Sequence, residues 1–161
     1  MTMQVTSQVA RLLREQNLTI ACAESCTGGM LMHELTNIPG SSAYMLGGIV
    51  AYSNTAKHSL LGVQENTLNV FGAVSEQVSA AMARGVRAAF GANIAIGITG
   101  IAGPDGGTPD KPVGLTYISY VTADMTVVRR YVWDGDRFAN KAASVQAALK
   151  LILEQLGDDN F

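Results

Sequence analysis

Ser25 is the residue whose surroundings best suit covalent chemistry. It lies in residues 23–29, AESCTGG, between an apolar segment typical of a buried strand and a segment typical of a helix. A turn from strand to helix exposes side chains at the end of a sheet, beside helix N–H groups that can stabilise an oxyanion. Gly28 and Gly29 allow a substrate to approach the backbone closely. The local sequence alone favours a simpler role, in which Ser25 or Thr27 is a helix N-cap.

A serine hydroxyl needs a base before it can attack a carbonyl carbon. The chain has only His33 and His58 as histidines, and His33 lies two turns into the helix after Ser25, where it is expected to point away from the turn. Lys57 is the better candidate, because desolvation lowers the pKa of a lysine and makes it a base. Tyr52, at the end of a predicted strand, could relay a proton to it. Spacing alone also allows simpler roles, in which Lys57 is a solvated helix lysine and Tyr52 is an aromatic residue at the edge of the sheet.

A glycine-rich loop is the second unusual feature. Five of the 17 glycines fall between Gly100 and Gly114, in a connection longer than most loops between strands. The loop has neither the Walker A pattern nor G-x-G-x-x-G, but its backbone could form a nest for a phosphate or carboxylate. A surface loop of several turns is an equal alternative. Thr99, at the end of the preceding strand, adjoins the loop and could point into a site at the sheet edge.

Arg137 opens the last predicted helix, where a cation does not complement the helix dipole. It could bind an anion, pair with Asp136, or simply be solvated. Cys22 and Cys26 have no third ligand near them and form no convincing metal pair. Cys26 is a rival nucleophile to Ser25.

Composition limits the classes of protein to consider. The 161 residues are 48% apolar and 15% charged, which suits one globular domain over residues 1–161. The net charge of −2, without a Lys/Arg cluster, argues against broad binding to nucleic acid. No segment suits a membrane span or a signal peptide, and two cysteines suggest no disulfide framework, so we expect a cytoplasmic protein without membrane contact. The low charge suggests a homo-oligomer.

The hydrophobic pattern alternates between helical periods and short apolar runs, which predicts an α/β layered domain. Helices are expected at residues 5–17, 30–35, 54–62, 75–89 and 138–156, and strands at 18–23, 48–52, 92–98, 113–121 and 125–132. The last two strands form a hairpin, which makes a mostly parallel sheet mixed, and strand 92–98 is apolar enough to be central. Asn54 and Ser75 are expected N-caps. A buried stripe is predicted for the last helix: Phe138, Ala142, Val145, Leu149, Ile152 and Leu156.

Several motifs, taken together and in this order, are similar to those of a known family, although no single motif would identify it. They are residues 23–29 (AESCTGG), 39–42 (PGSS), 47–54 (GGIVAYSN) with Lys57, 61–63 (LGV), 72–75 (GAVS), 99–104 (TGIAGP) and 111–114 (KPVG). Over nearly its whole length the chain resembles the C-terminal domain of the competence/damage-inducible protein CinA, whose stand-alone members are nicotinamide-nucleotide amidohydrolases. The N-terminal domain of longer CinA proteins is not matched, so the resemblance implies no pyrophosphatase activity.

The resemblance implies hydrolysis of the carboxamide of nicotinamide mononucleotide to nicotinic acid mononucleotide and ammonia, within pyridine nucleotide recycling. It implies a Ser-Lys amidase without metal or cofactor, folded as a three-layer α/β/α sandwich that forms homodimers or higher homo-oligomers. Carried over by motif, Ser25 is the nucleophile, Lys57 the base, Tyr52 its assistant and Thr99 a further catalytic residue. The expected substrate-binding residues are Thr27, Gly28, Gly29, Gly48, Asn54, Gly100, Gly103 and Arg137. The alternatives are a non-catalytic nucleotide-binding or interaction module and an amidase for another small amide.

Overall fold

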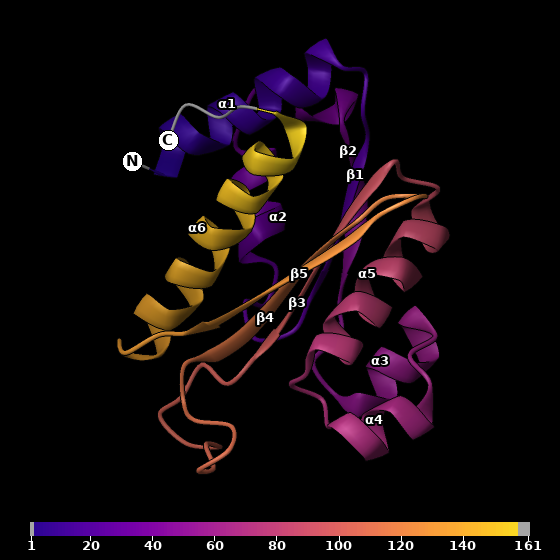
Figure 1. The fold of residues 1–161 in the computed structure, drawn as a ribbon. Coiled ribbons are helices and arrows are strands. Elements are labelled where there is room, and N and C mark those ends of the chain that lie inside the picture. Colours follow the sequence, from indigo (N-terminus) through magenta and orange to yellow (C-terminus); the bar gives the residue numbers. More distant parts are fainter. Residues whose placement is uncertain (1, 158–161) are drawn as a thin grey trace.

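The computed structural model describes residues 2–157 and arranges them as alternating helices and strands (Figure 1). The helices are α1 (Thr2–Glu15), α2 (Met30–Thr36), α3 (Asn54–Leu61), α4 (Glu65–Phe71), α5 (Glu76–Phe90) and α6 (Arg137–Leu156), with a 3₁₀ helix η1 (Ser41–Ala43). The strands are β1 (Ile20–Glu24), β2 (Met45–Val50), β3 (Ile94–Gly100), β4 (Leu115–Val121) and β5 (Thr126–Val132). Among the described residues, no helix combines the length and the apolar character needed to cross a membrane.

The strands form one sheet in the order β2-β1-β3-β4-β5. Strand β1 is parallel to β2 and β3, and β4 is antiparallel to both β3 and β5, so every strand except β4 points the same way. This confirms the mixed, mostly parallel sheet with a C-terminal hairpin. It also confirms the central position expected of β3, whose side chains are buried up to its last residue.

Helices cover both faces of the sheet, which makes the predicted α/β/α sandwich (Figure 1). Helices α1, α2 and α6 pack on one face, and α3, α4 and α5 lie on the other. Alternate side chains of β3 reach opposite cores: Ile96 belongs to the core under α1, α2 and α6, and Ala95 to the core under α5. A strand buried on both faces needs apolar residues at every position, which explains the unbroken apolar run.

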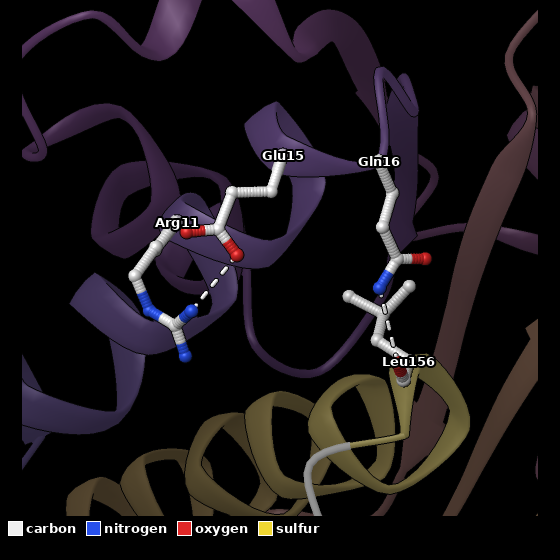
Figure 2. A network of polar contacts seen from close by, with 4 residues as sticks. All are labelled: Arg11, Glu15, Gln16 and Leu156. Atoms are coloured by element: carbon white, nitrogen blue, oxygen red, sulfur yellow. Dashed lines mark hydrogen bonds and ion pairs between the residues drawn. The ribbon is translucent and has the colours of Figure 1, made fainter.

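The C-terminal ends of α1 and α6 are joined directly (Figure 2). The Gln16 side-chain amide donates to the Leu156 carbonyl at 3.1 Å, so one of the last helix carbonyls, which lack partners within the helix, is satisfied. Along α1, Arg11 and Glu15 form an exposed ion pair at 2.8 Å with i, i+4 spacing. The contact to Leu156 fixes one end of α6, whose other end carries Arg137.

Most element boundaries agree with the sequence, and the exceptions have local causes. Ser75 caps α5 as predicted, accepting from the Val78 N–H. For α3 the cap is Ser53, which has extended backbone and accepts from the Ala56 N–H, so the prediction of Asn54 as cap was wrong. Phe138 was also misassigned to the buried stripe, because it is 71% exposed. Val145, Leu149 and Ile152 are buried where α6 packs into the core with α1, whereas Ala142 and Leu156 of the predicted stripe are half-buried.

Candidate active site

The site lies where the three parallel strands end. Glu24, the last residue of β1, pairs with Val50 of β2 and with Ile98 of β3. Ser25 follows directly, and its backbone N–H donates to the Ile98 carbonyl at 2.9 Å. The strand ends are therefore level, and Ser25 lies just beyond them, at the carboxyl edge where open α/β sheets bind ligands.

Ser25 and Lys57 meet at this edge. The Lys57 Nζ lies 3.1 Å from the Ser25 Oγ and 3.1 Å from the Tyr52 carbonyl oxygen. Lys57 is only 2% exposed, and both of its acceptors are uncharged. Burial lowers the pKa of Lys57 from its ordinary value of 10.5, because a desolvated ammonium is disfavoured. The geometry brings together the hydroxyl and the amine that the sequence singled out separately.

Tyr52 accepts a hydrogen bond from Lys57 at its backbone carbonyl. Its ring is 59% exposed, and its hydroxyl accepts a hydrogen bond from Arg137 Nη2 at 2.8 Å. The sequence suggested a proton relay by the Tyr52 hydroxyl, but the structure aims that hydroxyl at Arg137 instead of Lys57.

Glu24 seals the N-terminus of α2. Its carboxylate, 1% exposed, accepts from the Thr27 hydroxyl at 2.6 Å. It also accepts from the backbone N–H groups of Gly29 (3.1 Å), Leu31 (3.1 Å) and Met32 (2.9 Å). The expectation that these helix N–H groups are free for an oxyanion was therefore wrong, because Glu24 occupies them.

Two backbone N–H groups nearer to Ser25 remain. Those of Cys26 and Thr27 donate to no other residue in the part of the chain that the structure describes. Cys26 lines the cavity beside Ser25. In strand-to-helix nucleophile turns, the N–H of the residue after the nucleophile is the usual oxyanion donor.

The first turn of α6 holds the start of the glycine-rich loop. Arg137 Nη1 donates to the Gly103 carbonyl at 2.7 Å, and the buried Asn140 Nδ2 donates to the Ala102 carbonyl at 3.0 Å. Through its second contact, to Tyr52, Arg137 bridges this loop and the segment after β2. Helix α6 thus positions one wall of the site.

The opposite wall is held from the connection between α4 and α5. Thr99, buried at the end of β3, donates from its hydroxyl to the Ala73 carbonyl at 2.8 Å. Lys111 donates from Nζ to the Phe71 carbonyl at 2.6 Å and to the Val74 carbonyl at 2.8 Å. The glycine-rich loop is therefore anchored at both ends and is part of the site.

These walls enclose a cavity of about 260 Å³, close to the lower limit of about 300 Å³ usual for small-molecule sites. Its lining includes eight of the predicted site residues: Ser25, Tyr52, Asn54, Lys57, Thr99, Gly100, Gly103 and Arg137. Cys26, named from the sequence as a rival nucleophile, also lines the cavity, and the lining residues that sequence reasoning missed are Ala73, Val74, Ile101, Ala102, Asp105 and Gly106. A larger groove of about 600 Å³ between α3, α4 and α5 has no serine, cysteine or lysine among its described lining residues.

Four residues predicted to bind substrate lie outside this lining. Thr27 is 1% exposed and bonded to Glu24. Gly28 and Gly29 have positive φ of 62° and 95°, which a turn this tight requires of glycine. A Cβ at Gly48 would stand 2.5 Å from the Cys22 carbonyl oxygen, so this glycine permits close packing of β2 against β1. The structure gives these four residues roles in shaping the turn and the sheet.

The sulfur of Cys26 is unsuited to attack. Burial raises the pKa of its thiol to about 11, so the thiolate that would be the nucleophile is scarce at neutral pH. The same pKa leaves Ser25, with Lys57 at hydrogen-bond distance, as the better nucleophile. No group of three or more His, Cys, Asp or Glu side chains arranged to hold a metal ion occurs among the described residues.

The sequence of the chain matches a known family of proteins. Residues 2–156 match the family model described as the CinA C-terminal domain. A putative competence-damage inducible protein of Moorella thermoacetica is 53% identical over 150 residues, 93% of this chain and 36% of its own length. A CinA-like protein of Geotalea uraniireducens is 51% identical over 83% of this chain and 32% of its own length. The chain thus spans about a third of the length of these curated relatives.

Solved structures of similar size share the fold. A competence-damaged protein (CinA) superfamily protein from Klebsiella pneumoniae is 35% identical, with a TM-score of 0.94, and the match covers 97% of this chain and 98% of that one. The competence/damage inducible protein CihA from Agrobacterium tumefaciens is 37% identical, with a TM-score of 0.93, over 98% of this chain and 96% of that one.

Proposed function

The chain belongs to the CinA C-terminal domain family, and from that premise and the geometry of its site we propose that it is an amidohydrolase. The proposed reaction converts nicotinamide mononucleotide and water to nicotinic acid mononucleotide and ammonia. The observation that carries the proposal is the buried contact of 3.1 Å between Lys57 Nζ and Ser25 Oγ. This contact favours catalysis over binding alone, because burial lowers the pKa of Lys57 and makes its free amine available as a base.

Activation of Ser25 begins with neutral Lys57. Burial lowers the pKa of Lys57. A larger fraction of Lys57 is therefore in the free-amine form than of a solvated lysine at the same pH. The Tyr52 carbonyl accepts one N–H of the amine and so leaves the nitrogen lone pair available to the Ser25 hydroxyl. As the Ser25 Oγ forms its bond to the carboxamide carbon, its proton passes to Lys57.

The carbonyl oxygen of the substrate then becomes an oxyanion. We assign its stabilisation to the Cys26 and Thr27 N–H groups, which donate to no other residue in the described range. Lys57 gives its proton to the departing nitrogen as the C–N bond breaks, and ammonia leaves. Water attacks the resulting ester with Lys57 again as base, which releases the carboxylate product and restores the Ser25 hydroxyl.

Arg137 and Thr99 support this chemistry from the walls. Arg137 binds Gly103 and Tyr52. It therefore holds both the glycine-rich loop and the segment whose Tyr52 carbonyl accepts from Lys57. Thr99 binds the Ala73 carbonyl and keeps the α4–α5 connection against the cavity. Both act on the shape of the site, because a bound substrate reacts well only in a narrow range of geometries.

The test is ammonia release from nicotinamide mononucleotide by the wild type and by Ser25→Ala. We expect the variant to lose at least about a thousandfold in kcat while keeping the wild-type circular dichroism and melting temperature. Ser59→Ala, at an exposed position in α3, is the matched control and should keep full activity. Unchanged activity of Ser25→Ala would refute the mechanism, and binding of the mononucleotide without any turnover by the wild type would favour the non-catalytic module.

A further inference from the structure

Lys141 is a cation close to the nucleophile turn that the proposed mechanism does not use. It lies in α6, is half-buried, and makes no hydrogen bond or ion pair with another residue in the range 2–157. Its Nζ lies 3.7 Å from the point where a Cβ on Gly28 would stand. Lys141 therefore reaches over the turn three residues after Ser25. Burial raises the pKa of the Cys26 thiol, the Glu24 carboxylate raises it further, and the Lys141 ammonium lies close enough to lower it.

The charge of Lys141 adds to that of Arg137, one turn earlier on the same face of α6. Arg137 uses both terminal nitrogens on uncharged acceptors, the Gly103 carbonyl and the Tyr52 hydroxyl. Neither cation has a carboxylate partner among the described residues. Two like charges at i, i+4 disfavour a helix, and a bound anion would relieve that repulsion.

The nearby carboxylates are bonded to other groups or form no ion pair among the described residues. The Glu24 carboxylate is already bonded to four donors around the α2 N-terminus. Asp136 caps α6 by accepting from the Ala139 N–H at 2.8 Å. The exposed Asp105 lines the cavity but forms no ion pair within the described range. Arg137 and Lys141 therefore lie on the α6 side of the site without a carboxylate bonded to either, as far as the described residues go.

Helix α2 also cannot bind an anion at its N-terminus. In many α/β proteins a phosphate occupies the first turn of the helix after the first strand. Here the Glu24 carboxylate fills that place. Any phosphate brought to this edge of the sheet needs another partner, and Lys141 is the nearby cation without one.

Resting on the proposed function, we infer that Lys141 binds the phosphate of the nucleotide and so selects phosphorylated substrates, while Arg137 positions Tyr52 and the glycine-rich loop. A nicotinamide mononucleotide carries its amide and its phosphate at opposite ends. With the amide at Ser25, we place the phosphate beside the Lys141 ammonium, whose Nζ lies over the turn at Gly28.

The experiment compares nicotinamide mononucleotide with nicotinamide riboside, which lacks the phosphate. We expect Lys141→Gln to lower kcat/KM for the mononucleotide about tenfold to a hundredfold, mainly through KM, because it removes a charged phosphate contact. The kcat/KM for the riboside should change less than twofold in Lys141→Gln. Lys141→Arg should keep most of the wild-type kcat/KM for the mononucleotide. Lys150→Gln, at an exposed position of the same helix, is the control and should match the wild type on both substrates.

Calorimetric titration separates this inference from the proposed function. If the wild type releases no ammonia from either compound, the amidase proposal fails, but a mononucleotide affinity that drops in Lys141→Gln still supports the phosphate site. The inference is overturned if Lys141→Gln weakens the binding of both compounds equally, or weakens the binding of neither. It is also overturned if the wild type binds the mononucleotide no better than the riboside.

Discussion

Replacing Lys57 with Met tests the central claim about the site through two independent properties. The side chains are similar in length, so Met keeps the packing and removes the amine. Loss of a general base costs about 10²–10⁴-fold in rate, which is about 2.7–5.4 kcal/mol of transition-state stabilisation at 1.36 kcal/mol per factor of ten. We expect kcat for ammonia release to fall by that factor.

The second property is the pH dependence of stability. Burial lowers the pKa of Lys57 in the folded protein from 10.5, so the unfolded chain holds the proton over a pH range in which the folded protein has lost it. Below the pKa that Lys57 has in the folded protein, the free energy of unfolding of the wild type is therefore lowered by the full cost of burying the charged ammonium. It rises as pH increases from the folded pKa toward the unfolded value, by up to about 1.36 kcal/mol per pH unit. Lys57→Met lacks this contribution, so it should be the more stable protein at neutral pH.

The assay is denaturant unfolding of both proteins at several values between about pH 7 and about pH 10, beside pH profiles of kcat/KM. The wild type should gain stability relative to Lys57→Met as pH rises, and its activity should rise to a plateau with a midpoint below 10.5. Lys150→Met, with an exposed side chain, should run parallel to the wild type. A stability difference that stays constant over the whole range would refute the desolvated lysine and its use as a base.

Two further predictions concern the residues that shape the site. Glu24→Gln should lower the free energy of unfolding by about 2–3 kcal/mol, because an amide cannot satisfy the N–H groups that the buried carboxylate holds; denaturant unfolding checks this, and an unchanged midpoint would contradict it. Lys111→Met should raise KM and cost about 1–2 kcal/mol of stability through its lost bonds to the Phe71 and Val74 carbonyls. Faster amide exchange confined to residues 101–113 should accompany it, with Lys111→Arg as control; protection equal to the wild type would show that the loop does not need this anchor.

Sequence patterns predicted the fold well because most elements are marked by their own residues. The apolar run of β3 and the hairpin of β4 and β5 needed no distant information. Helix α4 was missed because its seven residues bury only Leu68, so it shows no helical stripe. The stripe of α6 was extended wrongly to Phe138, since periodicity cannot tell where the helix leaves the core.

The site was predictable in its chemical groups but not in its contacts. Ser25, Lys57 and Arg137 were identified from motifs, yet the partners of Arg137 are the Tyr52 hydroxyl and a carbonyl of the glycine-rich loop. Such contacts join segments 34 and 85 residues apart, and no local pattern encodes them. Glu24 did carry a usable signal, because a carboxylate just before a helix commonly binds the first N–H groups.

The position of Glu24 next to Ser25 raises a question about the base. A carboxylate bonded to Lys57 would hold the pKa of that lysine up and remove its value as a base. Successive side chains at a strand end point to opposite faces of the sheet. The Glu24 carboxylate accordingly turns to α2, and Ser25 turns to Lys57 on α3. Glu24 contributes to the pKa of Cys26, but burial dominates that of Lys57 and no carboxylate opposes it. The alternation of the strand thus lets one short motif close the N-terminus of α2 on one face and contact a desolvated lysine on the other.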